Sequence, residues 1–187
     1  SLGFDVVEHL TVDDDRERIV AALRSLSRRV DLVVGTGGLG PTTDDLTAAA
    51  TAEAMGVELV RDEASLEQIR RFFEQIGRPM SSWNEKQADL PAGCTVLPNA
   101  NGTAPGFAVT FGRARMYFMP GVPREMKAMF AEHAAPEIAA TADRRTHQIH
   151  LRTLGIGESD IQQRLADVEA SHPGITLGYR AHMPEVE

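Results

Sequence analysis

A glycine-rich segment, residues 35–40, joins an apolar run at residues 30–34 to an alanine-rich helical pattern expected over residues 44–55. A strand, a tight glycine turn and a helix in this order form the ordinary unit of α/β folds, which restricts the chain to that class. Backbone N–H groups in such a turn suit a bound phosphate, as does the positive end of the helix that follows. The segment therefore predicts a phosphate or diphosphate site at the end of a strand.

Two adjacent carboxylates, Asp44 and Asp45, follow this turn. Beside a bound phosphate they would repel it, and a divalent cation that bridges carboxylate and phosphate oxygens would remove the conflict. Carboxylates are also usual caps at the start of a helix. The sequence leaves both interpretations open: a metal-assisted phosphate site, or a capped helix behind a tight loop.

Two better-known nucleotide motifs are disfavoured at this turn. Gly35, Gly37 and Gly40 match the dinucleotide fingerprint Gly-x-Gly-x-x-Gly. That fingerprint requires a helix that continues directly from the glycines, whereas Pro41 and two threonines intervene here. Pro41 also stands where a Walker A loop requires its lysine.

Composition excludes several classes of protein. The chain has 187 residues, of which 42% are hydrophobic and 25% charged, as expected for one globular domain and a small second one. Its net charge of −8 disfavours a general nucleic-acid-binding surface. The single cysteine, Cys94, can form no internal disulfide and suits a reducing cytoplasm. No apolar run approaches the roughly 20 residues of a membrane span, and no signal peptide is visible.

Hydrophobic periodicity predicts alternating strands and helices. We expect strands at residues 4–12, 31–35, 57–60, 95–97, 107–110 and 114–119, and helices at residues 13–29, 44–55, 62–76, 83–88 and 123–140. The last two strands are expected to form a hairpin across residues 111–113. This order predicts a three-layer α/β/α domain with a mostly parallel sheet, in which ligands lie beyond the carboxyl ends of strands. The glycine-rich turn and the turn at residues 119–123 should then face each other.

A second, smaller unit is expected after residue 142. Strands at residues 147–151 and 175–179, a turn at residues 154–159 and a helix at residues 160–168 indicate a small α+β domain that is cut short. We therefore divide the chain into residues 1–142 and 143–187. Because the first residues resemble the end of a helix followed by a strand, we also expect that a strand and a helix of the first domain precede residue 1.

Five ordered blocks resemble the N-terminal region of the CinA (competence/damage-inducible protein) family. They are Thr-Gly-Gly-Leu-Gly-Pro-Thr-Thr-Asp-Asp-Leu-Thr at residues 36–47, Gly-Arg-Pro-Met at 77–80, Asn-Glu-Lys-Gln-Ala at 84–88, Gly-Thr-Ala-Pro-Gly at 102–106 and Pro-Gly-Val-Pro-Arg-Glu-Met at 120–126. The tail at residues 152–158 resembles the start of that family's small KH-like domain. The family's N-terminal strand and acidic loop have no counterpart in this sequence.

The resemblance implies a molybdopterin-binding fold of the MoaB/MogA/MoeA type. It also implies metal-dependent ADP-ribose pyrophosphatase activity that gives AMP and ribose 5-phosphate, in a homodimer. We expect a divalent metal, Mg²⁺, Mn²⁺ or Co²⁺, and a cytoplasmic location. The fold alone does not decide the function. The alternatives are a module that binds molybdopterin or a nucleotide without hydrolysis, and a catalytically silent scaffold that dimerises through its small domain. Partners on the first two interpretations are a small nucleotide or pterin, with no membrane and no nucleic acid.

The resemblance also assigns site residues. The phosphate loop would be Thr36, Gly37, Gly38, Leu39, Gly40, Pro41, Thr42 and Thr43, and the metal-binding or catalytic acids would be Asp44 and Asp45. Lys86, with Asn84 beside it, would bring a positive charge to the diphosphate, although a lone lysine is more often solvated. Gly102, Thr103, Gly121 and Pro123 would form the opposite rim. Because indole buries a large area, Trp83 is expected to anchor the core or its edge rather than to stack on a base.

Overall fold

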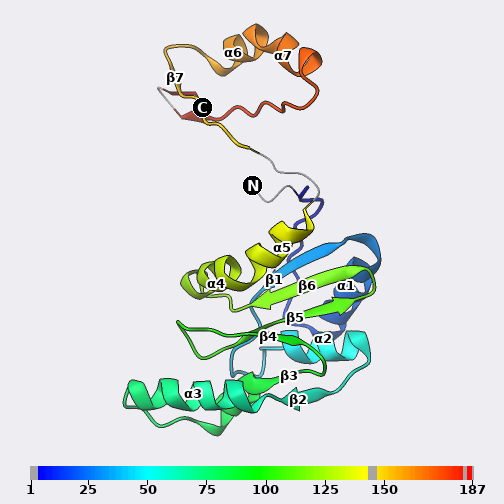
Figure 1. Ribbon diagram of the computed structural model, residues 1–187, viewed down its shortest axis with the longest axis vertical. Coiled ribbons are helices and arrows are strands. Elements are labelled where there is room, and N and C mark those ends of the chain that lie inside the picture. Colours follow the sequence, from blue (N-terminus) through cyan, green and yellow to red (C-terminus); the bar gives the residue numbers. More distant parts are fainter. Residues whose placement is uncertain (1–3, 143–146, 183–184, 187) are drawn as a thin grey trace. The chain divides into compact units, whose positions relative to one another are not determined.

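The computed structural model describes residues 4–142, 147–182 and 185–186. The chain forms two compact units, one within residues 2–143 and one within residues 144–187. Figure 1 labels most of the elements of the two units. The helices of the first unit are α1 (Arg16–Arg29), α2 (Thr47–Met55), α3 (Glu63–Gln75), the 3₁₀ helix η1 (Ser82–Ala88), α4 (Pro123–Met129), the π-helical η2 (Phe130–Ala134) and α5 (Ala135–Thr141). Its strands are β1 (Leu32–Thr36), β2 (Leu59–Arg61), β3 (Asp89–Pro91), β4 (Thr95–Leu97), β5 (Gly106–Phe111) and β6 (Ala114–Met119).

The main sheet has four described strands in the order β1-β6-β5-β4. β1 pairs with β6 in parallel, whereas β6 with β5 and β5 with β4 are antiparallel. The expected hairpin is confirmed: Phe111 pairs with Ala114 across a two-residue turn in which Gly112 has φ +60°. The sheet is therefore mixed, because a turn this short returns the chain beside its own strand, whereas parallel pairing needs a long crossover.

Side chains of β5 and β6 alternate between the two faces of this sheet. Phe107, Met116 and Phe118 pack with α1 and α2, while Ala108 and Tyr117 pack with the α4–α5 helices on the other face. Figure 1 shows the helices covering both faces. The period-two burial that predicts a strand thus also produces two cores and three layers. The predicted α/β class and its α/β/α layering are confirmed.

A smaller substructure carries one wall of the candidate site. β2 and β3 pair antiparallel, and α3 packs against η1 through Leu66, Ile69 and Ala88. The guanidinium of Arg61 in β2 donates to both carboxylate oxygens of Asp89 in β3. These contacts fix the position of η1, the short helix that the sequence predicts at residues 83–88.

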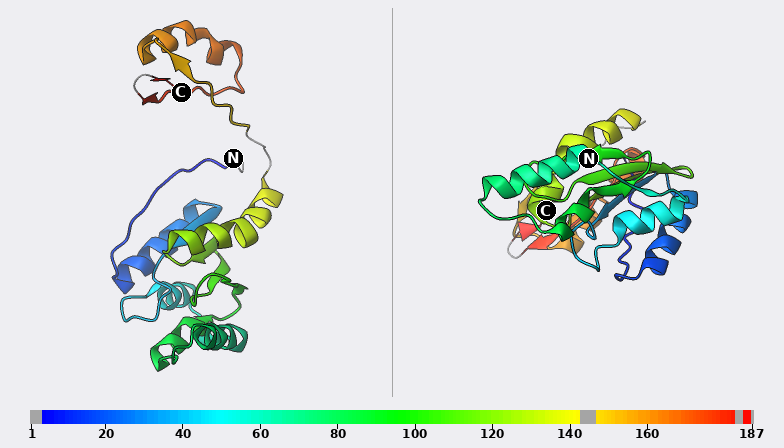
Figure 2. Two further views of the ribbon diagram at one scale, coloured as in Figure 1. Left: turned by 90° about the vertical axis from the view of Figure 1, so that its left-hand side faces the viewer. Right: turned by 90° about the horizontal axis from the view of Figure 1, so that it is seen from below.

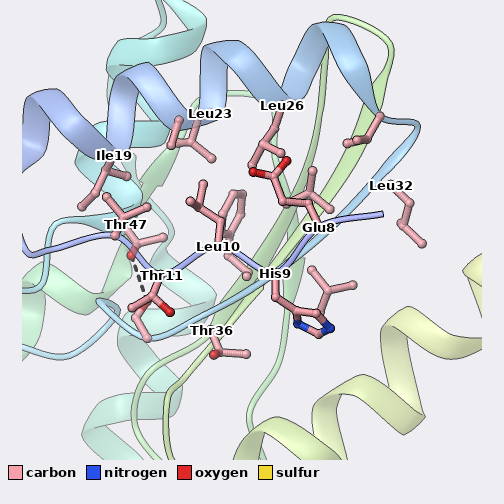
Figure 3. Close-up of a pocket in the computed structure, with 18 of the residues that line it drawn as sticks. Glu8, His9, Leu10, Thr11, Ile19, Leu23, Leu26, Leu32, Thr36 and Thr47 are labelled. Atoms are coloured by element: carbon pink, nitrogen blue, oxygen red, sulfur yellow. Dashed lines mark hydrogen bonds between the residues drawn. The ribbon is translucent and has the colours of Figure 1, made fainter. Parts of the chain in front are cut away.

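Residues 4–12 do not form the predicted strand. They run extended before α1 (Figure 2, left) and pair with no described strand. A strand is stable only when a neighbour completes its hydrogen bonds, and a cavity of about 750 Å³ separates this segment from β1. Apolar side chains of α1, among them Leu23 and Leu26, line one wall of that cavity (Figure 3).

The C-terminal unit also differs from the prediction. It contains β7 (Thr153–Leu154), α6 (Glu158–Arg164), α7 (Ala166–Ser171), β8 (Ala181–His182) and β9 (Glu185–Val186), with the antiparallel strand order β7-β9-β8. Residues 147–151 and 175–179 form no strand, and the predicted helix at 160–168 is interrupted at Leu165. Alternating apolar residues predicted strands in these two segments, but the sheet of this unit forms from residues 153–154, 181–182 and 185–186 instead. The predicted KH-like fold is not confirmed.

Candidate functional site

The glycine-rich turn connects β1 to α2 and is fixed at both ends by hydrogen bonds. The Gly37 N–H donates to the carbonyl of Met119 at the end of β6 (2.9 Å), and the Thr47 hydroxyl donates to the carbonyl of Gly37 (2.8 Å). The Thr47 N–H donates to the carbonyl of Gly38 (3.0 Å). Gly38 has φ +66°, a backbone conformation that residues with a side chain rarely adopt. Its amide and that of Gly40 make no hydrogen bond to the described residues, so both are available to a ligand.

Asp45 fastens this loop rather than capping the helix. Its Oδ2 accepts hydrogen bonds from the N–H of Thr42 (2.9 Å) and from the Thr42 hydroxyl. α2 begins at Thr47, three residues later than the sequence predicts, and has no side-chain cap. The capped-helix interpretation is therefore wrong, because the carboxylate closes the turn at residues 42–45 instead.

Asp44 is the more accessible of the two carboxylates. Its side chain is exposed, and its pKa lies below the ordinary value, chiefly because the Thr42 hydroxyl lies nearby, with its own backbone N–H and the charge of Lys86 adding to the effect. Among the described residues, no three His, Cys, Asp or Glu side chains gather closely enough to hold a metal ion. Mg²⁺ characteristically binds through one or two carboxylates plus substrate phosphates, so this loop fits a cation only when a ligand supplies the remaining oxygens.

Lys86 reaches the glycine-rich loop from η1. Its Nζ donates to the carbonyl oxygens of Thr42 and of Asp45, the latter at 2.8 Å. The structure thus places Lys86 beside the loop, where its ammonium group and the Asp45 carboxylate both hold residues 42–45 through hydrogen bonds. The Lys86 ammonium group therefore contacts the backbone of Asp45, the residue that follows Asp44.

Replacing Lys86 with methionine should open the loop. The variant keeps the length of the side chain but loses both hydrogen bonds, so we expect the unfolding free energy to fall by about 1 kcal/mol. Hydrogen exchange at the amides of residues 42–46 should become faster, while β5 and β6 keep their protection. Lys86→Arg is the matched control, because it retains the charge and should restore part of the protection. Unchanged exchange at residues 42–46 in the methionine variant would contradict this role.

Residues 99–104, which include Gly102 and Thr103 of the opposite rim, are held in place by buried polar groups. Asn99 is 1% exposed; its Nδ2 donates to the carbonyl of Ala104 (2.9 Å) and to Oε2 of Glu125 (2.7 Å). Gly102 lies against the same carboxylate, where an added Cβ would come within 2.3 Å of Oε2 of Glu125. The Thr103 hydroxyl accepts a hydrogen bond from Nε2 of Gln87 (3.2 Å).

Three of these residues were not predicted as site residues: Gln87, Asn99 and Glu125. Gln87 and Glu125 lie inside blocks shared with the CinA family, and their place in these blocks could have identified them from the sequence. Asn99 lies outside those blocks, and only the burial of its side chain, with three hydrogen-bond partners, identifies it. Asn84 turns inward, since it accepts from the N–H of Ser81 and its Nδ2 donates to Oε1 of Gln87 (3.4 Å). It therefore supports η1 rather than facing the loop.

The two predicted turns do meet. An added Cβ on Gly121 would lie 3.5 Å from Cα of Gly37, which places the turn after β6 directly against the glycine-rich loop. Pro123 begins α4 at this turn. The cavity next to residues 4–12 is lined by that segment, by apolar side chains of α1 and by β1, and it reaches the loop at Thr36, Gly38 and Thr47 (Figure 3). The cavity therefore borders the glycine-rich loop on the side of Gly38 and Thr47.

Comparison with known proteins identifies the family of this chain. A family model described as a probable molybdopterin binding domain matches residues 1–140. The chain belongs to this family. The CinA-like protein of Geobacter metallireducens is 41% identical over 187 residues, which cover 99% of this chain and 45% of that protein. A CinA-like protein of Escherichia coli is also 41% identical and is covered to 46%. The chain thus spans less than half the length of these relatives.

A solved structure supports the same assignment. The crystal structure of CinA from Thermoplasma acidophilum is 36% identical, with a TM-score of 0.60 over 67% of this chain and 72% of that one. The resemblance to CinA drawn from the five sequence blocks is therefore confirmed. Within the described residues, no helix has the length and apolar character needed to traverse a bilayer.

Proposed function

We propose that this domain binds the diphosphate of ADP-ribose on the turn between β1 and α2 and hydrolyses it to AMP and ribose 5-phosphate. One observation carries the proposal: a glycine-rich turn offers the free amides of Gly38 and Gly40 at the start of a helix that lacks a side-chain cap, with an exposed carboxylate, Asp44, beside it. Amides so placed suit phosphate oxygens. A carboxylate in this place favours a ligand that brings a cation with it.

Each residue then has a separate task. The amides of Gly38 and Gly40 orient the diphosphate, and the Asp45 and Lys86 contacts hold the loop in the conformation that exposes them. Asp44 is the residue that would hold a divalent cation together with the phosphate oxygens. When bound, such a cation polarises the phosphorus–oxygen bonds and lowers the pKa of water. Water adds its oxygen to one phosphorus, the bond from that phosphorus to the bridging oxygen breaks, and each product leaves as a phosphate monoester.

AMP release from ADP-ribose tests this proposal directly. We expect release with Mg²⁺, Mn²⁺ or Co²⁺ and none in EDTA, with activity restored when the metal is added back in excess. Boiled protein controls for metal-catalysed breakdown of the substrate. No release with any of the three metals, from protein that melts cooperatively, would refute hydrolysis.

A binding module without hydrolysis is the second candidate. Two observations favour it. The Asp45 carboxylate already accepts two hydrogen bonds from Thr42. Among the described residues, no group of three His, Cys, Asp or Glu side chains could hold a metal ion. Here the same turn would hold the phosphate of a pterin or nucleotide. Saturable binding of AMP without turnover of ADP-ribose would select this function. The homodimer and the cytoplasmic location stay predictions on either function.

A further inference from the structure

Trp83 lies on the surface, although the sequence led us to expect it in the core or at its edge. It is 61% exposed, while the hydrophobic residues of the neighbouring α3–η1 cluster are buried. Exposed indole is costly because its apolar area stays in contact with water. It is also the only tryptophan of the chain. A single uncovered indole on the helix that carries Lys86 needs an explanation.

The geometry of η1 gives the direction of this side chain. In a 3₁₀ helix, residues three apart lie on the same face, about 6 Å apart along the axis. Asn84 and Gln87 share one face and hydrogen-bond to each other, and Gln87 continues to Thr103 on the rim. Glu85 and Ala88 share the second face, where Glu85 binds Arg61 and Ala88 is buried.

Trp83 and Lys86 share the third face. Lys86 on this face donates to the carbonyls of Thr42 and Asp45, so the face looks onto the glycine-rich loop. The exposed indole therefore lies about one helical turn from the group that closes the candidate phosphate site. Indole offers a flat apolar surface on which a planar ring can stack.

We propose that Trp83 stacks on the planar heterocycle of the ligand whose phosphate occupies the turn between β1 and α2. This inference rests on the proposed phosphate site, but it requires no hydrolysis. It makes Trp83 a specificity-determining residue that distinguishes a ring-bearing phosphate, such as a nucleotide, from a phosphate without a ring. It also accounts for the exposure of the indole, since the ligand covers it.

AMP and ribose 5-phosphate are matched probes, because both carry one phosphate on a ribose but only AMP carries a planar ring. In the wild-type chain, AMP should quench the fluorescence of the single tryptophan and bind at least 10-fold tighter than ribose 5-phosphate in calorimetry. Trp83→Ala should weaken AMP binding by about 5- to 100-fold and leave ribose 5-phosphate unchanged. Trp83→Phe keeps a ring and should recover most of the AMP affinity.

Ile76→Ala serves as the control, since Ile76 is another exposed apolar side chain, at the end of α3 and 47% exposed. It should bind both probes as the wild type does. Unchanged ribose 5-phosphate binding and thermal unfolding show that Trp83→Ala is folded. AMP binding that is insensitive to Trp83→Ala, absence of quenching, or no binding of either probe would each overturn the proposal. Quenching by AMP without AMP release from ADP-ribose would retain the stacking role and reject the hydrolase.

Discussion

Replacing Gly38 with alanine is expected to abolish phosphate binding and to lower the unfolding free energy by about 2–3 kcal/mol. The residue has φ +66°, and an added Cβ would lie 2.2 Å from Oγ1 of Thr47. That hydroxyl donates to the carbonyl of Gly37, so displacing it breaks the contact that ties the turn to α2. Urea unfolding measures the stability, and calorimetric titration with AMP measures the binding.

Gly37→Ala separates backbone strain from steric overlap. Gly37 has φ +96°, but an added Cβ would meet nothing within 4 Å. This variant should lose about 1–2 kcal/mol, the cost of the backbone conformation alone. If Gly38→Ala destabilises the chain no more than Gly37→Ala does, the packing of Thr47 against the turn is not what fixes the loop.

Exchanging each of the two aspartates for asparagine should affect activity and stability differently. Asp44→Asn is expected to reduce metal-dependent hydrolysis by about 100-fold or more, with thermal unfolding unchanged, because the side chain is exposed. Asp45→Asn should lower the unfolding free energy by about 1–2 kcal/mol, since its carboxylate accepts two hydrogen bonds from Thr42. Its activity should fall as a consequence of the loosened loop.

Initial rates of AMP release, together with melting temperatures, distinguish the two roles. The pKa of Asp44 lies below its ordinary value, so this carboxylate stays ionised at neutral and mildly acidic pH, and its protonation should not limit hydrolysis there. Full activity in Asp44→Asn would remove this residue from the reaction. Unaltered stability in Asp45→Asn would show that the Thr42 contacts contribute nothing measurable.

Local patterns predicted most elements of the first unit. Residues 95–97 and 114–119 form strands with the expected bounds, and α3 lies within one residue of the prediction at each end. These segments have clear periodicity, and the turns and caps that bound them act within a few residues. α1 and α2 each begin three residues later than predicted. At α2, the side chain that could have capped the helix, Asp45, accepts hydrogen bonds within the preceding turn instead.

Segments without a local partner were predicted less well. Residues 4–12 alternate as a strand should, yet they pair with no described strand. In the C-terminal unit the apolar segments at residues 147–151 and 175–179 are also unpaired, and the sheet forms from other residues. Strand formation depends on a neighbour that is distant in sequence, so periodicity alone does not determine it.

The sequence by itself determined the α/β class, the glycine-rich turn and the membership of the CinA family, because these depend on short-range spacing and on ordered motifs. Only the tertiary structure decided how the site is assembled. It separated Asp44 from Asp45 by their hydrogen bonds, brought Lys86 to the loop across 41 residues of sequence, and left Trp83 exposed on the same face of η1. Such roles depend on contacts between segments that packing brings together, and no local pattern encodes them.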